Sequence, residues 1–255
     1  MRTPDEHRQL VESYLSDLAL TPELGELHES MRYALESGKR VRAVICLATA
    51  EAAGAEPDMA LPAAASLELV QAFSLVHDDL PALDDDRERR GRASTWARFG
   101  HAEGILAGDA LLAESFRLAL SYPSTAVARE LAQATLGMIG GQYLDITDTA
   151  PDEATLHRLK TGCLFSASVG LALWVADVSE RDQAPWRAFG DELGLLFQIV
   201  DDILDGDGYV LSHGAEGARA LADEAAARAR ERLTHIPADT AILADIVEVL
   251  ATRTA

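Results

Sequence analysis

The stretch LVHDDLPALDDD, from Leu75 to Asp86, places five aspartates in nine positions at the end of an apolar segment. A second acidic stretch, QIVDDILD from Gln198 to Asp205, follows more than a hundred residues later and is also embedded in apolar sequence. An ionised carboxylate away from water is costly unless it has a cationic or hydrogen-bonding partner. The two stretches therefore indicate a site that holds a cation between two acidic clusters.

Apolar residues recur at helical spacing through most of the chain, and no segment shows the alternation that is typical of a half-buried strand. Aromatic residues make up only 5% and alanine and leucine are abundant, which favours helix over strand. There is no internal repeat and no linker. We therefore predict an all-α, single-domain bundle over residues 1–255, with helices at 4–20, 21–35, 41–53, 58–79, 101–120, 126–146, 152–174, 181–205, 215–234 and 239–253.

Composition limits the classes of partner. The net charge of −20 argues against nucleic acid, because a phosphate backbone needs a basic surface. Cys46 and Cys163 form no CxxC motif, and reduced core cysteines suit a cytoplasmic protein. The opening MRTPDEHRQL does not resemble a signal peptide, and we find no apolar run of the roughly 20 residues that a transmembrane helix needs. We expect a cytoplasmic protein without an integral membrane segment.

Basic residues gather in two short segments. GKRVR, Gly38 to Arg42, puts three cations at the start of a predicted helix, where free N–H groups and the helix dipole already attract anions. This segment is a candidate anion site, and a solvated charged turn is the alternative. RERRGR, Arg87 to Arg92, follows the first acidic stretch. Only two of the 22 basic residues are lysines, Lys39 and Lys160, which suggests a specific role for each.

The second acidic stretch has a simple geometry. Its polar residues are spaced at i, i+3, i+4 and i+7, which predicts one helical face that carries an amide and three carboxylates: Gln198, Asp201, Asp202 and Asp205. A solvated acidic face is the alternative. Carboxylate donors without His or Cys suit a hard cation, and Mg²⁺ typically shares one or two carboxylates with substrate phosphates. Together with the basic segments, the clusters predict Mg²⁺-diphosphate binding; Ca²⁺ is the weaker candidate because no EF-hand loop is present.

Five motifs occur in order along the chain: GKRVR, LVHDDLPALDDD with the following RRG, GGQYLD, KTG and QIVDDILD. Together they resemble the trans-prenyltransferases, the isoprenyl diphosphate synthases of the bacterial farnesyl and geranylgeranyl diphosphate synthase type. The resemblance covers about residues 38–205. It implies an all-α bundle around a central cavity, usually a homodimer. It also implies Mg²⁺-dependent condensation of isopentenyl diphosphate with an allylic diphosphate, by ionisation, condensation and elimination without a side-chain nucleophile.

The resemblance also implies roles for individual residues. Mg²⁺ ligands would be Asp78 and Asp84 with Asp79 beside them, and Asp201 with Asp202 and Asp205 in support. The allylic diphosphate and the catalytic site would involve Arg89, Lys160, Thr161 and Gln198. Isopentenyl diphosphate would be bound by Lys39, Arg42 and Arg90, with Arg40 nearby.

Product length is expected to depend on the helix that leads into the first acidic stretch. Phe73 lies five residues before Asp78, and the resemblance implies that an aromatic side chain there forms the floor of the product pocket, with Ser74 beside it. An ordinary core phenylalanine is the alternative. We expect a short product, of farnesyl length first and of geranylgeranyl or geranyl length next.

The sequence departs from the family pattern in two places. Gln71 stands where a histidine usually contacts isopentenyl diphosphate, and glutamine donates a hydrogen bond without charge. The segment 205–220 is short and lacks the lysines that help to close over the allylic diphosphate, with Arg219 or His213 as partial substitutes. A non-catalytic or weakly active regulatory subunit therefore stays an alternative. A terpene-cyclase-like enzyme is disfavoured, because the second stretch keeps DDxxD and no NDxxSxxxE-like pattern occurs.

Overall fold

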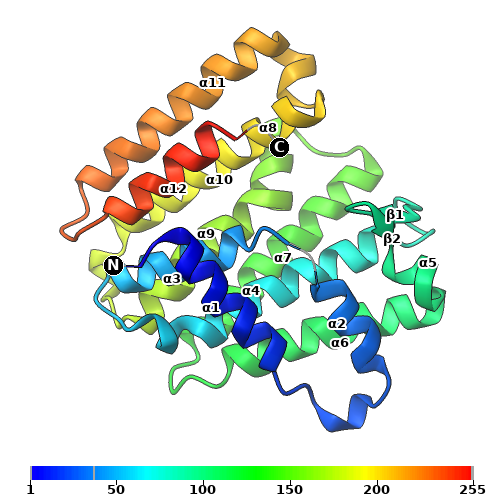
Figure 1. Cartoon of the computed structure of the whole chain (residues 1–255). Helices are drawn as coiled ribbons and strands as arrows, with labels where there is room; N and C mark the ends of the chain where they lie inside the picture. Colours follow the sequence, from blue (N-terminus) through cyan, green and yellow to red (C-terminus); the bar gives the residue numbers. More distant parts are fainter. Residues whose placement is uncertain (1, 37, 254–255) are drawn as a thin grey trace.

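The computed structural model describes residues 2–36 and 38–253, most of which lie in α-helices (Figure 1). The α-helices in chain order are α1 (Pro4–Asp17), α2 (Leu27–Leu35), α3 (Val41–Ala52), α4 (Pro57–Asp78), α5 (Thr95–Phe99), α6 (His101–Ala119), α7 (Ala126–Thr147), α8 (Glu153–His157), α9 (Cys163–Val175), α10 (Ala184–Asp205), α11 (Tyr209–Thr234) and α12 (Ala241–Ala251). Short 3₁₀ turns span Pro22–Leu24 and Glu180–Asp182, and a π-helix spans Arg158–Gly162. The predicted all-α fold is confirmed.

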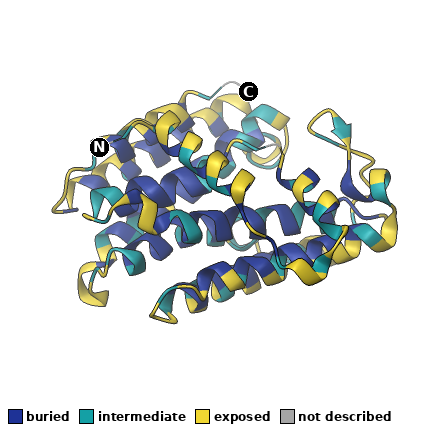
Figure 2. Ribbon diagram, turned by 60° about the horizontal axis from the view of Figure 1, so that its bottom comes forward, coloured by how far each residue is buried: buried dark blue, intermediate teal, exposed yellow. Residues whose placement is uncertain are grey.

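Helix α4 runs through the centre of the bundle and packs against α3, α6 and α9 (Figure 1). Figure 2 shows that the inner faces of the helices are mostly buried. Its run of small residues, Ala63 to Ser66, is buried, which lets neighbouring helices approach closely. By length and composition alone α4 could cross a membrane, with a mean hydropathy of 1.5 over an 18-residue window, although we expected no such run. Within the bundle 67% of that window is buried, as is typical of a central core helix.

The remaining helices complete two apolar cores. One core surrounds α4 and includes side chains of α1, α2, α3, α6, α7 and α9. The other lies between α3, α9, α10, α11 and α12, and the last three of these lie side by side along one flank (Figure 1). Because α3 and α9 contribute to both cores, the ends of α4 and α10 that carry the two acidic stretches are held in one rigid frame.

A small hairpin interrupts the helices, contrary to the absence of strands in the sequence prediction. Strands β1 (Glu88–Arg89) and β2 (Arg92–Ala93) pair antiparallel within the basic run. The connecting residues Arg90 and Gly91 both have positive φ, 56° and 74°, as a tight two-residue hairpin turn requires. Strands of two residues are too short for any alternation to be visible in the sequence.

Three helix boundaries also differ from the prediction. The helix predicted at 21–35 begins later, because a 3₁₀ turn follows Thr21 and α2 begins only at Leu27. The segment predicted as one helix at 152–174 is divided by the π-helix between α8 and α9. A short helical segment from Tyr209, included in α11, precedes the helix predicted at 215–234, and the two are separated by non-helical backbone angles at Gly214 (φ 72°, ψ 163°).

Candidate active site

A cavity of about 980 Å³ opens between the C-terminal ends of α4 and α10. Charged and polar residues from both acidic stretches, both basic segments and the KTG motif line it. They include Asp78, Asp201, Asp205, Lys39, Arg42, Arg90, Lys160 and Thr161. Its apolar lining comes mainly from α4 and α7, namely Ala72, Phe73, Leu75, Met138, Ile139, Tyr143 and Ile146. Segments that are far apart in the sequence therefore meet around one space that is charged in one part and apolar in another.

Two of the carboxylates that face the cavity, Asp78 and Asp201, are partly buried. Burial raises the pKa of Asp78 to about 6, although the nearby Lys160 opposes this shift. Burial also raises the pKa of Asp201, against Arg253, whose Nη1 donates to Asp201 Oδ1 at 3.1 Å. The backbone N–H of Asp84 donates to the Asp78 carbonyl at 2.9 Å, so the turn after α4 brings the exposed Asp84 back beside Asp78, although Asp84 does not line the cavity.

This donor set fits a hard divalent cation. All candidate ligands are carboxylates that come from the ends of two helices, and the raised pKa values of Asp78 and Asp201 show that the surrounding cations do not fully offset the burial of these two groups. The fit rests on Asp78 and Asp201; Asp205 also lines the cavity, whereas Asp84 does not.

Asp79 and Arg89 form a separate ion pair beside the cavity. The Asp79 side chain is buried, and its Oδ1 accepts a hydrogen bond from Arg89 Nε at 2.8 Å. Arg89 also pairs with Asp86 Oδ2 at 3.2 Å. Neither Asp79 nor Arg89 lines the cavity. In this structure their contacts tie the hairpin to the end of α4, so any role at the diphosphate site requires Arg89 to leave these partners.

The polar face predicted for the second stretch divides in two. Asp201 and Asp205 line the cavity, whereas Gln198 and Asp202 do not. Gln198 Nε2 donates to Asp202 Oδ1 at 2.6 Å, and the backbone N–H of Tyr209 donates to Asp202 Oδ2 at 2.9 Å. All four residues share one face of α10 by their spacing, as expected, but only Asp201 and Asp205 reach the cavity, because Asp202 turns toward the start of α11.

Lys39 and Arg42 bring positive charge to the cavity near Asp201. Arg42 lies over the Phe165 ring, 4.5 Å from its centroid, and burial lowers its pKa to about 10, which still leaves it cationic at neutral pH. Burial, and then the nearby Arg253, lower the pKa of Lys39. Arg40 lies at the same edge, but its guanidinium contacts Glu12 at 2.9 Å and Glu68 at 3.4 Å, so its charge is already balanced.

The π-helix brings Lys160 and Thr161 to the cavity. Lys160 pairs with Asp145 of the GGQYLD motif. The second glycine of that motif, Gly141, has no room for a side chain, because an added Cβ would lie 2.4 Å from the Lys160 backbone nitrogen. The GGQYLD motif of α7 and the KTG motif of the π-helix therefore pack directly against each other, and this contact positions the Lys160 side chain.

The sequence matches the family model described as polyprenyl synthetase over residues 25–250. The chain belongs to the polyprenyl synthetase family. It is 37% identical to geranylgeranyl diphosphate synthase of Cyanophora paradoxa over 216 residues, 78% of this chain and 72% of that protein. It is 38% identical to farnesyl diphosphate synthase of Bacillus subtilis over 198 residues, 71% of this chain and 67% of that protein.

Other relatives are longer, and the match spans only 57% of geranylgeranyl pyrophosphate synthase 7 of Arabidopsis thaliana. Among solved structures, a geranyltransferase from Legionella pneumophila superposes with a TM-score of 0.88 at 28% identity, over 98% of this chain and 96% of that one. The family and the expected fold are thereby confirmed, and the family identifies the chain as a prenyltransferase.

Within this polyprenyl synthetase, the side chains predicted to set product length do line the cavity. Phe73 is buried, and its ring lies edge-on to His77 with centroids 5.0 Å apart. Ser74 Oγ donates to the Gln71 carbonyl at 3.0 Å, and both residues reach the same cavity. Phe73 lies one and a half turns before Asp78, roughly 7.5 Å back along the axis of α4.

Arg253 is a cavity residue that the sequence analysis missed. Besides its contact with Asp201, its guanidinium lies 5.4 Å from the centroid of the Phe197 ring, which also lines the cavity. Arg253 follows α12 by two residues, within a short polar tail. An isolated arginine at such a place carries no pattern, so only the fold could reveal it. Asp109 on α6 was missed as a lining residue for the same reason, whereas His77 lies within the first acidic stretch and was given no role there.

The lysine-free segment after Asp205 does not close over the cavity in this structure. Of the described residues between 206 and 220, none lines it. Arg219 donates to the Ala251 carbonyl at 2.7 Å, and the His213 ring lies near Tyr209 with centroids 5.9 Å apart. The expectation that Arg219 or His213 stands in for the missing lysines is therefore wrong for this conformation, because both side chains are engaged elsewhere.

Proposed function

We propose that this prenyltransferase condenses isopentenyl diphosphate head-to-tail with an allylic diphosphate and releases a short-chain prenyl diphosphate. One observation carries the proposal: aspartates of both acidic stretches and the cations Lys39, Arg42, Arg90 and Lys160 line one cavity that continues into an apolar space. The relatives named as geranylgeranyl and farnesyl diphosphate synthases support it.

The cavity suits two diphosphates in different roles. Lys160 and Thr161 lie with the aspartates, so they would contact the diphosphate that leaves. Lys39, Arg42 and Arg90 would hold the diphosphate that stays on the product. Mg²⁺ bound by Asp78 and Asp201 would neutralise negative charge that develops on the leaving group.

The chain's own residues support the reaction by binding, orienting and excluding water. The C–O bond of the allylic substrate breaks, and its carbocation needs a dry cavity, because water would capture it. Phe73, Met138 and Ile139 supply apolar walls for the hydrocarbon. The double bond of isopentenyl diphosphate forms the new C–C bond, and the released diphosphate accepts the proton that is lost. Each step proceeds without a nucleophilic side chain.

The product is proposed to be of farnesyl length, because Phe73 limits the depth of the cavity. Phe73→Ala is expected to shift the main product to at least one isoprene unit longer, since the hydrocarbon can then extend past the emptied position. Chain-length analysis by mass spectrometry measures this shift. Phe189→Leu, which changes a fully buried phenylalanine in the other core that does not line the cavity, is the control. An unchanged product length in Phe73→Ala would contradict the floor role.

The proposed activity is tested by incubating the purified protein with Mg²⁺, isopentenyl diphosphate and, in turn, dimethylallyl, geranyl and farnesyl diphosphate. A diphosphate product five carbons longer than a starter supports the proposal. Release of a hydrocarbon or alcohol from a starter alone would instead support a terpene-cyclase-like activity. Absence of any product would support a non-catalytic subunit.

A homodimer is proposed from the exposed apolar side chains of α6 and α7. They are 44–68% exposed, namely Ile105, Leu106, Leu136, Ile139, Tyr143 and Ile146. The last three also line the cavity, so a covering surface would complete its wall. Light scattering is expected to give twice the 27.3 kDa mass of one chain. Leu136→Glu is expected to yield monomer, whereas Leu211→Glu on α11 is not; a monomeric wild type at tens of micromolar would refute the dimer.

A further inference from the structure

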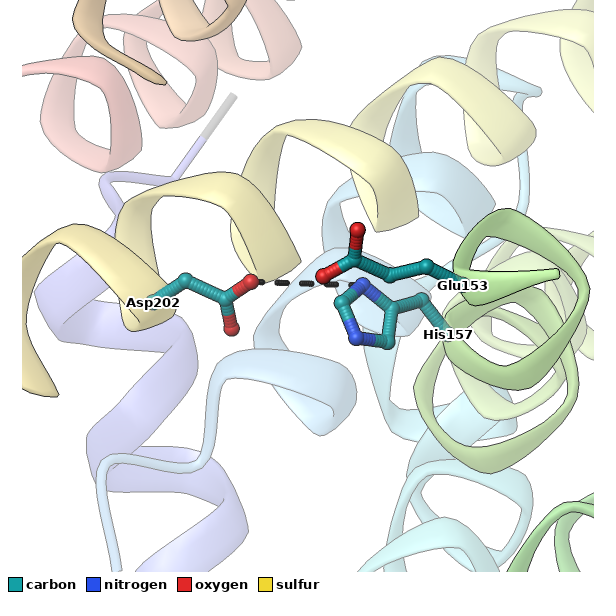
Figure 3. Close-up of side chains that lie close together, drawn as sticks. All are labelled: Glu153, His157 and Asp202. Atoms are coloured by element: carbon teal, nitrogen blue, oxygen red, sulfur yellow. Dashed lines mark ion pairs between the residues drawn. The ribbon is translucent and has the colours of Figure 1, made fainter. Parts of the chain in front are cut away.

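A second group of possible metal ligands lies outside the diphosphate cavity. Glu153 and His157 are four residues apart on α8, and both point toward Asp202 on α10 (Figure 3). One ligand atom from each of the three residues lies within 4.8 Å of the other two. His157 Nδ1 and Asp202 Oδ2 lie 4.0 Å apart. None of the three residues lines the cavity described above.

The His157 imidazole has a buried nitrogen without the hydrogen-bond partner that buried polar groups normally have. Its Nδ1 is buried and has no hydrogen-bond partner in the described part of the chain, and the side chain is only 15% exposed. Leaving a buried polar nitrogen unpaired is costly, so such groups usually bind a water molecule or an ion. The Tyr209 ring packs edge-on against the imidazole, with centroids 5.2 Å apart, which keeps the ring facing Asp202.

The two carboxylates keep free acceptor positions. Asp202 is 5% exposed, and each of its oxygens accepts one hydrogen bond, from Gln198 and from the Tyr209 backbone. Glu153 Oε2 accepts one from Ser212 Oγ at 2.9 Å. A carboxylate oxygen has two lone pairs, so each still has one for a metal. With a neutral imidazole, the three residues carry two negative charges, which one divalent cation balances.

We propose that Glu153, His157 and Asp202 bind a divalent transition-metal ion such as Zn²⁺, at a site separate from the Mg²⁺-diphosphate cavity. One imidazole nitrogen and two carboxylate oxygens, with water as a fourth ligand, match a zinc donor set. Mg²⁺ prefers oxygen donors and octahedral geometry, so the imidazole selects against it. Tetrahedral zinc needs these atoms roughly 3.5 Å apart, which requires shifts of about 1 Å that the partly exposed Glu153 side chain can supply.

A metal at this site would connect two helices that lead into the diphosphate cavity. Helix α8 runs directly into the π-helix that carries Lys160 and Thr161, and α10 carries Asp201 one residue before Asp202. A metal that joins α8 to α10 therefore fixes two sides of the diphosphate cavity relative to each other. Because a ligand that binds only the folded state stabilises it, Zn²⁺ is expected to raise the melting temperature of the protein.

The test uses full-length, tag-free protein after chelation and dialysis, in an Asp78→Asn background that weakens the diphosphate cavity as a competing metal site. Zn²⁺ is titrated by calorimetry, and Co²⁺ is followed by its visible absorption. The Asp78→Asn protein, in which Glu153, His157 and Asp202 are unchanged, is expected to bind one equivalent of Zn²⁺. Millimolar Mg²⁺ is not expected to displace the bound Zn²⁺. His157→Gln and Glu153→Gln are each expected to weaken binding at least about tenfold and to abolish the thermal shift.

The matched control is His235→Gln, which removes an exposed imidazole at the end of α11 and should leave binding unchanged. Zn²⁺ binding that is equally tight in His157→Gln and Glu153→Gln would overturn the proposal, as would absence of binding to the folded protein. No substrate is used, so this outcome is independent of whether the chain catalyses condensation.

Discussion

Replacing Asp78 or Asp201 with asparagine is expected to lower kcat for condensation by about 10²–10³-fold or more. Each substitution removes a charge from the carboxylate pair that faces the cavity from the ends of α4 and α10. The cation that offsets the leaving diphosphate is then bound weakly or misplaced, and the loss falls mainly on the charge-separating step. Steady-state kinetics at saturating Mg²⁺ measure the effect, and circular dichroism checks that the helices remain.

Asp85→Asn is the matched control for this experiment. Asp85 lies in the same turn, is exposed, and has a positive φ of 54°, a conformation that asparagine also adopts readily. Its side chain does not line the cavity. Activity within about twofold of the wild type is expected. Asp78→Asn or Asp201→Asn enzyme that keeps more than a tenth of wild-type kcat at saturating Mg²⁺ would contradict the assigned roles.

Asp78→Asn is also expected to make the metal-free protein more stable at neutral pH, by about 1–3 kcal/mol. Burial raises the Asp78 pKa to about 6, so the ionised carboxylate is disfavoured in the folded state relative to the unfolded chain. Asparagine has a similar shape and no charge to bury. The same substitution should therefore remove activity and add stability, which is the behaviour expected of a residue kept for function.

The pH dependence follows from the sign of this shift. The folded state binds the Asp78 proton more tightly than the unfolded state, where the pKa is about 4. Stability from this group is therefore complete below about pH 4 and is lost as pH rises through 6. Urea unfolding of metal-free wild type and Asp78→Asn should differ little at pH 4 and most above pH 6. A difference that does not change with pH would show that another cause dominates.

Much of this site could be predicted because its charged residues occur in recognisable short sequence patterns. Asp78 and Asp201 stand out as carboxylates in apolar helical sequence, and Lys39 and Lys160 stand out as the rare lysines. Their meeting in one cavity followed from the family resemblance and is seen in the fold. Helix periodicity likewise located α4 and α10 to within a few residues.

The remaining features depend on contacts between distant segments. Asp201 and Asp202 are about 100° apart around α10, and only the packing of Gln198 and Tyr209 decides that Asp202 turns away from the cavity. Arg253 reaches Asp201 because α12 returns along α10 and α3. Such placements are properties of the tertiary fold, and no local pattern records them.

The most direct test of the central claim is incorporation of labelled isopentenyl diphosphate with geranyl diphosphate as the starter. The wild type is expected to form farnesyl diphosphate only when Mg²⁺ is present, with EDTA abolishing the product and Asp201→Asn nearly so. Failure of the folded wild type to form any condensation product, with this or a shorter or longer starter, would contradict the account. So would full product formation in the presence of EDTA.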